Sequence, residues 1–251
     1  MTSRWDAIRR FCLFVGYGRS GHSAVGALLD AHPHATVSHE LHAVKRFFDG
    51  VTRDVLFDEI FALAQRQARE GRYASRAGGG SYRHNLPGQV KADASGITLI
   101  GDKKGAGTAW QLERHGLENI DSFKKYIGVP VSILHIIRNP FDIVAAGMAR
   151  GQEDFSRTVA VVSEIRDRCR GADWRDVYYE DLVARPDEEI RGILTFLGLP
   201  VVPEHLAHSV EYLYREPRLR RYEIAWPDDT RTMVERLIVR HGYLGRYRWD
   251  Q

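Results

Sequence analysis

The sequence predicts a three-layer α/β/α fold with a central, mostly parallel β-sheet. One observation is that short, continuous apolar runs alternate with longer amphipathic stretches along the chain. Continuous apolar strands separated by helices are typical of a parallel sheet that helices cover on both faces. A second observation is that a Gly-rich turn joins the first apolar run, residues 11–15, to a helical pattern. Because the 251 residues contain no evident linker, we expect a single domain over residues 1–251.

Five apolar runs are the expected strands: residues 11–15, 35–38, 97–100, 131–137 and 176–179. Apolar residues recur with helical spacing between these runs. The expected helices are residues 23–31, 41–49, 53–70, 107–126, 140–149, 153–170, 186–197, 203–213 and 228–241. Residues 74–91 form a Gly-rich stretch that is too long for an ordinary connection. We expect that stretch to be a functional lid, with a plain disordered excursion as the alternative.

The net charge of the chain is small, but its basic residues are mostly Arg. The formal net charge is +3, which is too small to indicate nucleic-acid binding. Of the 36 basic residues, 30 are Arg and six are Lys. Arg binds phosphate and carboxylate groups better than Lys because its guanidinium donates two parallel hydrogen bonds. Coding bias nevertheless explains most of the excess of Arg over Lys.

Cysteine content and the N-terminal residues bear on the compartment. Cys12 and Cys169 are far apart and belong to no CxxC motif, so neither a disulfide framework nor a zinc site is expected. The apolar run at residues 11–16 is too short for a signal-peptide core or a membrane span. We therefore expect a soluble, cytoplasmic protein without membrane insertion.

The turn at residues 16–23 (GYGRSGHS) has the layout of a phosphate-binding loop. Its glycines allow the backbone to present N–H groups, and the helix N-terminus supplies partial positive charge. Arg19 can fork onto phosphate oxygens, and Ser20 and Ser23 offer hydroxyls. The nucleotide-triphosphatase loop needs Gly-Lys-Ser/Thr at its end, whereas His22 stands here in place of that Lys. A mere strand–helix connection is the alternative.

Four segments carry recognisable motifs in chain order: residues 18–23 (GRSGHS), 101–104 (GDKK), 135–142 (HIIRNPFD) and 177–200, which begins VYYEDL and ends FLGLP. Together these segments resemble sulfotransferases that use 3′-phosphoadenosine 5′-phosphosulfate, and they are most similar to the Golgi-type and protein-tyrosine branch. Each motif alone is weak, but the four occur in the family's order. The resemblance implies a sulfotransferase-like α/β domain with a phosphate-binding loop, in which residues 41–96 form a helical and loop insertion on the acceptor side.

The resemblance implies a binding site for the phosphosulfate donor and no metal. Arg19 and the loop from Ser20 through Gly21 and His22 to Ser23 would bind the 5′-phosphosulfate. His22 replaces a hydroxyl residue of the family, so its imidazole either donates a hydrogen bond to the donor or plugs the loop.

Arg138 would bind the 3′-phosphate, with an ion pair to Asp142 as the alternative reading. The Ser that follows this Arg by eight residues in the family is Ala146 here. Tyr179 matches a tyrosine near the nucleotide, or else lies in the core as a strand residue. Basic residues at 218–221 would close over the 3′-phosphate, unless they are a solvated run.

The resemblance also implies the catalytic groups. Glu40 matches the general base of the protein-tyrosine branch, and its neighbour His39 is an alternative base, because imidazole titrates near neutral pH. Glu40 would need burial to raise its pKa toward 6–7; its alternative reading is a first-turn carboxylate of the next helix. Lys103, rather than Lys104, is expected to neutralise the leaving group.

The expected activity is transfer of a sulfonate group to a hydroxyl or amine by in-line displacement. One alternative is a nucleotide or small-molecule kinase with an atypical phosphate loop, and another is a catalytically degenerate phosphoadenosine-binding module. The acceptor is expected to be a small molecule, glycan, lipid or peptide, and not a nucleic acid. The sequence leaves a homodimer open.

Overall fold

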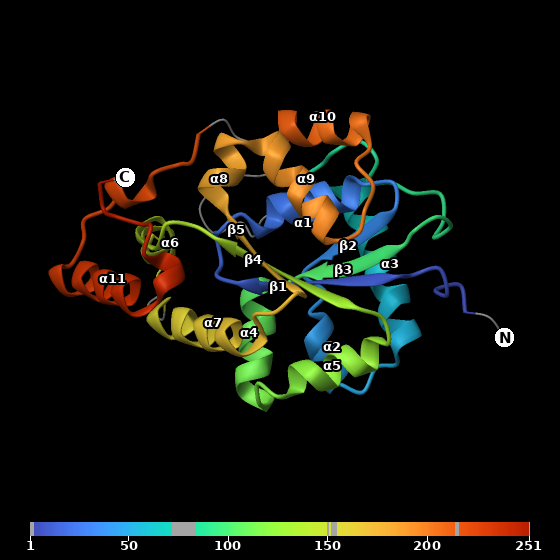
Figure 1. Cartoon of the computed structure of the whole chain (residues 1–251), viewed down its shortest axis with the longest axis horizontal. Coiled ribbons are helices and arrows are strands. Elements are labelled where there is room, and N and C mark those ends of the chain that lie inside the picture. The colour runs from blue at the N-terminus through green and yellow to red at the C-terminus, as the bar shows by residue number, and fades with distance from the viewer. Residues whose placement is uncertain (1–2, 72–83, 150, 152–154, 214–215, 251) are drawn as a thin grey trace.

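The computed structural model describes residues 3–71, 84–149, 151, 155–213 and 216–250. Its centre is a parallel sheet in the order β2-β3-β1-β4-β5, as Figure 1 shows. The strands are β1 (Arg10–Gly16), β2 (Ala35–His39), β3 (Leu99–Lys103), β4 (Val131–Ile137) and β5 (Trp174–Tyr178). The predicted fold class is confirmed, and every strand pairing in the described sheet is parallel.

Alternating residues of each strand bury two separate cores. Cys12 and Phe14 of β1 pack on one face, and Phe11, Leu13 and Val15 pack on the other. The first face is covered by α1 (His22–Ala31), α9 (Pro186–Phe196) and α10 (Pro203–Tyr212). The second face is covered by α4 (Gly105–His115), α5 (Asn119–Ile127) and α7 (Phe155–Cys169). These two layers lie on opposite sides of the sheet in Figure 1.

The 41–96 region contains two helices, α2 (Ala43–Phe48) and α3 (Arg53–Glu70). Helix α3 packs against β2, at the edge of the sheet, and α2 packs against α4 and α5. Of the Gly-rich stretch 74–91, residues 74–83 lie outside the described residues, so the lid expectation is untested there. The described remainder packs against α1. Gln89 donates to the carbonyl of Ala27, on that helix, and to the carbonyl of His84.

Three expectations about elements were wrong. Residues 107–126 form two helices instead of one, because the chain turns at Gly116 with φ of +104°, where a Cβ would collide with the Glu118 carboxylate. Tyr179 does not end a strand; it begins the short helix α8 (Tyr179–Ala184), which the sequence reading missed. Strand β3 also starts later than expected and runs on to Lys103.

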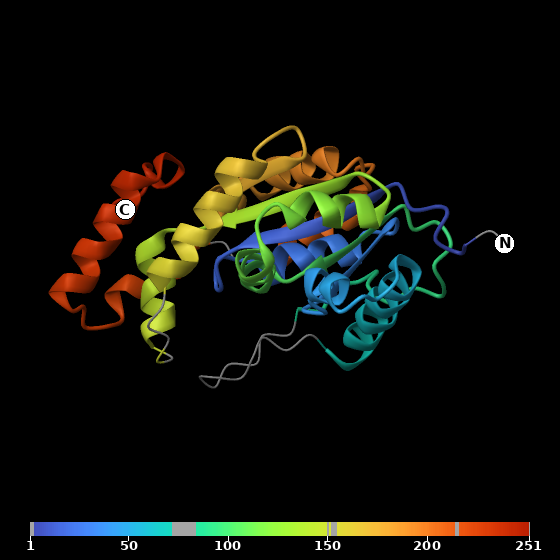
Figure 2. The ribbon, with the colours of Figure 1, turned by 90° about the horizontal axis from the view of Figure 1, so that it is seen from below.

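The C-terminal segment packs beyond the carboxyl ends of the strands (Figure 2). It contains η1 (Arg220–Tyr222), α11 (Asp228–Arg240) and η2 (Gly242–Leu244), which contact α6 (Pro140–Met148) and α7. Phe141 of α6 meets Trp226 and Trp249 edge to face, with ring centroids 5.9 and 5.2 Å away. None of the helices in the described part of the chain is long and apolar enough to cross a membrane.

Candidate active site

The carboxyl ends of the five strands bring the predicted site residues to one edge of the sheet. The loop with Arg19 follows β1, Glu40 follows β2, Lys103 ends β3, Arg138 follows β4 and Tyr179 follows β5. Ligands of open α/β sheets bind at this edge. The sheet therefore gathers residues that are up to 160 positions apart in the chain, as the motif order predicted.

The loop after β1 leaves the start of α1 open to an anion. Gly21, at the N-cap, has φ of +104°, and no side chain caps the helix there. A Cβ on Gly21 would lie 2.4 Å from a ring carbon of Tyr179, so only Gly fits beneath this ring. Ser23 is the second residue of α1 and is half-buried. The uncapped first turn presents N–H groups and the positive end of the helix dipole.

The His22 side chain is buried and uncharged beneath the loop. Its Nε2 donates to the carbonyl of Val15 at 3.2 Å, because a carbonyl can only accept, and Nδ1 lies 2.7 Å from the Ser20 hydroxyl, which also lies 3.0 Å from the carbonyl of Tyr17. Burial lowers the pKa of His22 to about 3, so the ring is uncharged at neutral pH. A Cβ on Gly16 or Gly105 would come within 2.8 Å of this ring. Ser20 is fully buried, so its hydroxyl points inward rather than into the site.

Arg19 and Arg138 carry buried N–H groups that lack acceptors, as Arg175 and Arg221 also do elsewhere among the described residues. Arg138 donates to the carbonyls of Arg19, at 3.3 Å, and of Arg218, and its guanidinium lies 5.1 Å from the ring centroid of Tyr179. Nη2 of Arg19 and Nε of Arg138 are buried without a hydrogen-bond partner in the part of the chain that the structure describes. Buried cationic donors are almost always paired, so these two atoms indicate a place for an anion.

Asp142 does not pair with Arg138. Its carboxylate instead accepts from the backbone N–H of Arg221 at 3.0 Å and from the Arg221 guanidinium at 2.7 Å. Burial raises the pKa of Asp142, and Arg221 opposes that rise. Both side chains of the pair are almost completely buried. Arg221 is therefore structural, whereas Arg218 is exposed and pairs with Glu223, and the 218–221 run is not a single solvated cluster.

Glu40 is held between the two lysines. Its Oε1 accepts from Nζ of Lys103 at 2.8 Å and its Oε2 from Nζ of Lys104 at 3.0 Å. Burial favours the neutral acid, but the two ammonium groups outweigh it and lower the pKa of Glu40 to about 2. The pKa of Glu40 therefore lies well below the 6–7 that a general base would need. The first-turn reading also fails, because the N-cap of α2 is His42.

Lys103 and Lys104 reach Glu40 from different sides. Lys103 is almost fully buried and packs on α1, where a Cβ on Gly26 would lie 2.9 Å from its Cγ. Burial lowers the pKa of Lys103, and the Glu40 carboxylate opposes that shift. Lys104 is the N-cap of α4, just past the strand, so strand alternation does not separate the two ammonium groups. Of the two lysines, Lys103 lies nearer the loop at residues 16–23, because it packs on α1, the helix that follows this loop.

His39 adjoins this cluster. Its Nε2 accepts from Nζ of Lys103 at 3.4 Å and lies 3.8 Å from Oε1 of Glu40. The side chain of Gln67, on α3, pairs with the backbone of His39 through both its oxygen, at 2.9 Å, and its nitrogen, at 2.8 Å. Both candidate bases therefore lie beside Lys103.

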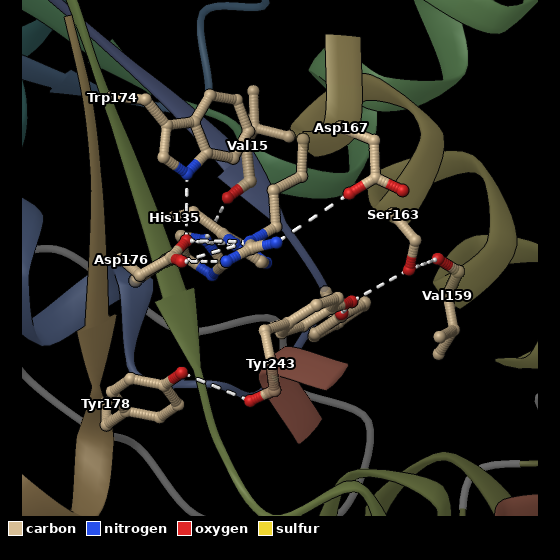
Figure 3. Close-up of polar contacts among 12 residues, drawn as sticks. Val15, His135, Val159, Ser163, Asp167, Trp174, Asp176, Tyr178 and Tyr243 are labelled. Carbon is tan, nitrogen blue, oxygen red and sulfur yellow. Dashed lines mark hydrogen bonds and ion pairs between the residues drawn. The ribbon is translucent and has the colours of Figure 1, made fainter. Parts of the chain in front are cut away.

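A buried polar network anchors the loop from below (Figure 3). Asp176 accepts from His135 at 2.9 Å, from Trp174 at 2.8 Å and from Arg166 at 2.6 Å. Burial opposes ionisation of Asp176, but these donors outweigh it and lower its pKa. Tyr243, on η2, bonds to the hydroxyls of Tyr17 and Ser163 and so ties the loop to the C-terminal segment.

Sequence reasoning gave no role to several residues of this edge. Gly105 makes room for His22, Gln67 holds His39, and Asp102 binds the turn that carries Glu40. Asp102 left a signal, since it is a carboxylate that directly follows the apolar start of β3. Ala146 is buried and offers no hydroxyl beside Arg138, as the sequence indicated. Among the described residues, no group of three or more His, Cys, Asp or Glu side chains gathers as a metal site requires.

Comparison with known proteins places this geometry in context. The sequence model described as "Sulfotransferase family" matches residues 131–204, from the start of β4 into α10. None of the curated proteins matches the chain.

Two solved structures share the fold. A sulfotransferase domain from the curacin biosynthetic pathway is similar with a TM-score of 0.53 and 12% identity, over 93% of this chain and 97% of that one. Sulfotransferase STF1 from Mycobacterium tuberculosis H37Rv is similar with a TM-score of 0.50 and 15% identity, over 93% of this chain and 76% of that one. The chain therefore has the sulfotransferase fold, and residues 131–204 carry the sequence pattern of that family.

Proposed function

We propose that the protein is a sulfotransferase that moves a sulfonate group from 3′-phosphoadenosine 5′-phosphosulfate to a hydroxyl or amine. The observation that carries the proposal is the pair of buried, unpartnered N–H groups on Arg19 and Arg138, which flank the uncapped start of α1. A donor with phosphate groups at both its 3′ and 5′ positions supplies anions for both arginines. The family match and the fold agree with this choice.

In this proposal, Arg19 and the backbone N–H groups from Ser20 to Ser23 bind the 5′-phosphosulfate. Ser20 and His22 contribute their amides, because their side chains bond to each other. Arg138, beside Tyr179, binds the 3′-phosphate through Nε. Two of its other N–H groups already donate to carbonyls, and these orient the guanidinium.

Glu40 and Lys103 carry the chemistry. The acceptor oxygen forms a bond to sulfur while the bond from sulfur to the bridging oxygen breaks; the acceptor proton passes to Glu40, and Lys103 neutralises the charge that develops on the leaving phosphate. In the free protein both lysines bind Glu40. A donor sulfonate that competes for these ammonium groups weakens their hold on Glu40. Burial then raises the pKa of Glu40 and makes it a stronger base.

The test uses 3′-phosphoadenosine 5′-phosphate, the product of the donor. At about 100 times its Kd, a ligand stabilises the folded state by ~2.7 kcal/mol, which corresponds to an increase in Tm of roughly 5–10 °C for a chain of this size. Arg19→Ala and Arg138→Ala should each abolish the shift. Arg157→Ala is the control, because Arg157 is exposed and pairs with Glu113 away from the site. No shift in the wild type would reject the donor.

Turnover is tested with Glu40→Gln in the same series. This variant should keep the ligand-induced shift in Tm and lose about 10²–10⁴ in kcat, the usual contribution of a general base. Normal turnover would move the role to His39. Binding of the phosphoadenosine without transfer to any acceptor would favour the degenerate module. No observation favours the kinase, since His22 occupies the position of its lysine and is held inward.

A further inference from the structure

The turn that carries Glu40 has an unfavourable backbone. Glu40 and His42 have φ of +69° and +67°, in the left-handed region that residues with a Cβ rarely adopt. The backbone N–H of Glu40 donates to the carbonyl of Lys103 at 3.1 Å. Such a conformation persists only where its surroundings hold it.

Asp102 supplies that hold. Its side chain is 1% exposed, and Oδ1 accepts from the N–H of Leu41 at 2.9 Å and from the hydroxyl of Ser38 at 2.8 Å. Oδ2 accepts from the N–H of Ala43 at 2.9 Å. The two backbone contacts therefore lie on either side of His42, and one of them immediately follows Glu40.

The strand register joins this hold to the lysine. Ser38 pairs with Asp102 and His39 pairs with Lys103 across β2 and β3. Asp102 directly precedes Lys103 at the end of β3. One side chain therefore fixes the turn that carries Glu40, and the next supplies the ammonium group that binds Glu40. We propose that Asp102 is a positioning residue that holds Glu40 beside Lys103. The proposal deepens, and rests on, the proposed function, since Glu40 matters as the base.

Two accepting oxygens are required at this position. Asp102→Asn keeps the shape of the side chain but replaces one accepting oxygen with an NH₂ group. Either orientation of the amide sets that NH₂ against a backbone N–H, of Leu41 or of Ala43, and leaves that N–H unpaired. The turn then relaxes while the phosphate loop, on another strand, keeps its shape.

The experiment compares Asp102→Asn with Asp30→Asn. Asp30 is the control, because it is also a fully buried carboxylate that accepts from a backbone N–H. Its partner is Val37 on β2, at 2.8 Å. Three quantities are measured in the whole chain: hydrogen exchange at the amides of Leu41 and Ala43, the Kd of 3′-phosphoadenosine 5′-phosphate, and kcat at saturating donor. Urea unfolding selects conditions in which each variant is folded.

In Asp102→Asn we expect exchange at Leu41 and Ala43 to rise and kcat to fall, each by roughly 10–100-fold, the effect of an unpaired buried N–H. The Kd should stay within about twofold, because the arginines are unaffected. Asp30→Asn should leave exchange at Val37 and kcat nearly unchanged, because the amide oxygen can take the place of the single oxygen that accepts from Val37. Unchanged exchange in Asp102→Asn, or an equal loss of kcat in Asp30→Asn, would overturn the proposal. A wild type that fails to bind the nucleotide rejects the proposed function instead, and exchange still decides whether Asp102 holds the turn.

Discussion

At the scale of single residues, burial and neighbouring charge act in opposite directions on Glu40 and in one direction on His22. Two ammonium groups keep Glu40 ionised although burial disfavours its charge. Burial lowers the pKa of His22 and the nearby positive charge of Lys103 lowers it further, so the ring is neutral. The strand ends therefore hold an ionised carboxylate between two ammonium groups and an uncharged ring beneath the loop that follows β1.

The His22 ring makes the stability of the protein depend on pH. Its folded pKa of about 3 lies below the ordinary value of 6.5, so the unfolded chain binds the proton more readily. The contribution of His22 is complete above pH 6.5 and is lost as the pH falls toward 3. His22→Asn keeps an acceptor for Ser20 but cannot titrate. The difference in unfolding free energy between wild type and His22→Asn should shrink between pH 6.5 and 3, as measured by urea unfolding. A difference that is constant over this range would contradict a neutral, buried His22.

At the scale of elements, α1 and α4 meet through the His22 ring. The ring belongs to the first turn of α1, and Gly105 begins α4. The absence of a Cβ at Gly105 allows the two helix starts to approach each other around the ring. The position of the phosphate loop therefore depends on a glycine in a different motif.

Gly105→Ala should destabilise the protein by about 1–3 kcal/mol, the usual cost of overpacking, because the new Cβ would lie 2.8 Å from Nε2 of His22. His22→Ser removes the ring. In that background the same Gly105→Ala change should cost almost nothing, which gives a coupling energy of comparable size in a double-mutant cycle. Urea unfolding of the four proteins measures it. Additive effects would show that the ring does not set the spacing.

The elements also separate what pattern can predict from what it cannot. The apolar run at residues 131–137 and the pattern at 53–70 coincide with β4 and α3, because burial of a continuous strand or of one helix face is written into local spacing. The start of α8 involves a contact with a distant residue, because the Tyr179 ring lies against the Gly21 backbone, whereas the break at Gly116 is a local turn at a positive φ. Local spacing carries no record of that distant contact.

At the scale of the whole molecule, the C-terminal segment completes the site from outside the sheet. It lies beyond the strand ends in both views of the ribbon (Figures 1 and 2). Arg218 offers its carbonyl to Arg138, Arg221 pairs with Asp142 of α6, and Tyr243 bonds to Tyr17. Three separate contacts thus connect residues after position 217 with the two segments proposed to bind the donor.

Breaking the Asp142–Arg221 pair should be costly. Arg221→Met leaves a buried carboxylate without its partner, and we expect a loss of ~3–5 kcal/mol in unfolding free energy. Adding Asp142→Ala to it should restore part of that loss, because no charge is then left unpaired. Arg191→Ala is the control, since its pair with Asp187 is exposed and should contribute less than about 1 kcal/mol. Equal losses in Arg221→Met and Arg191→Ala would show that the buried pair does not hold the segment.

The sequence by itself determined the layer order of the fold and the strand ends at which Arg19, Glu40, Lys103 and Arg138 lie. Hydrophobic periodicity is a local property, and parallel strands end at a common edge, so these positions follow without knowledge of contacts. The tertiary structure alone decided that His22 turns inward, that Asp142 pairs with Arg221, and that two lysines lower the pKa of Glu40. Those outcomes depend on which groups distant in the chain meet and on how much water they lose, and neither quantity can be read from local spacing.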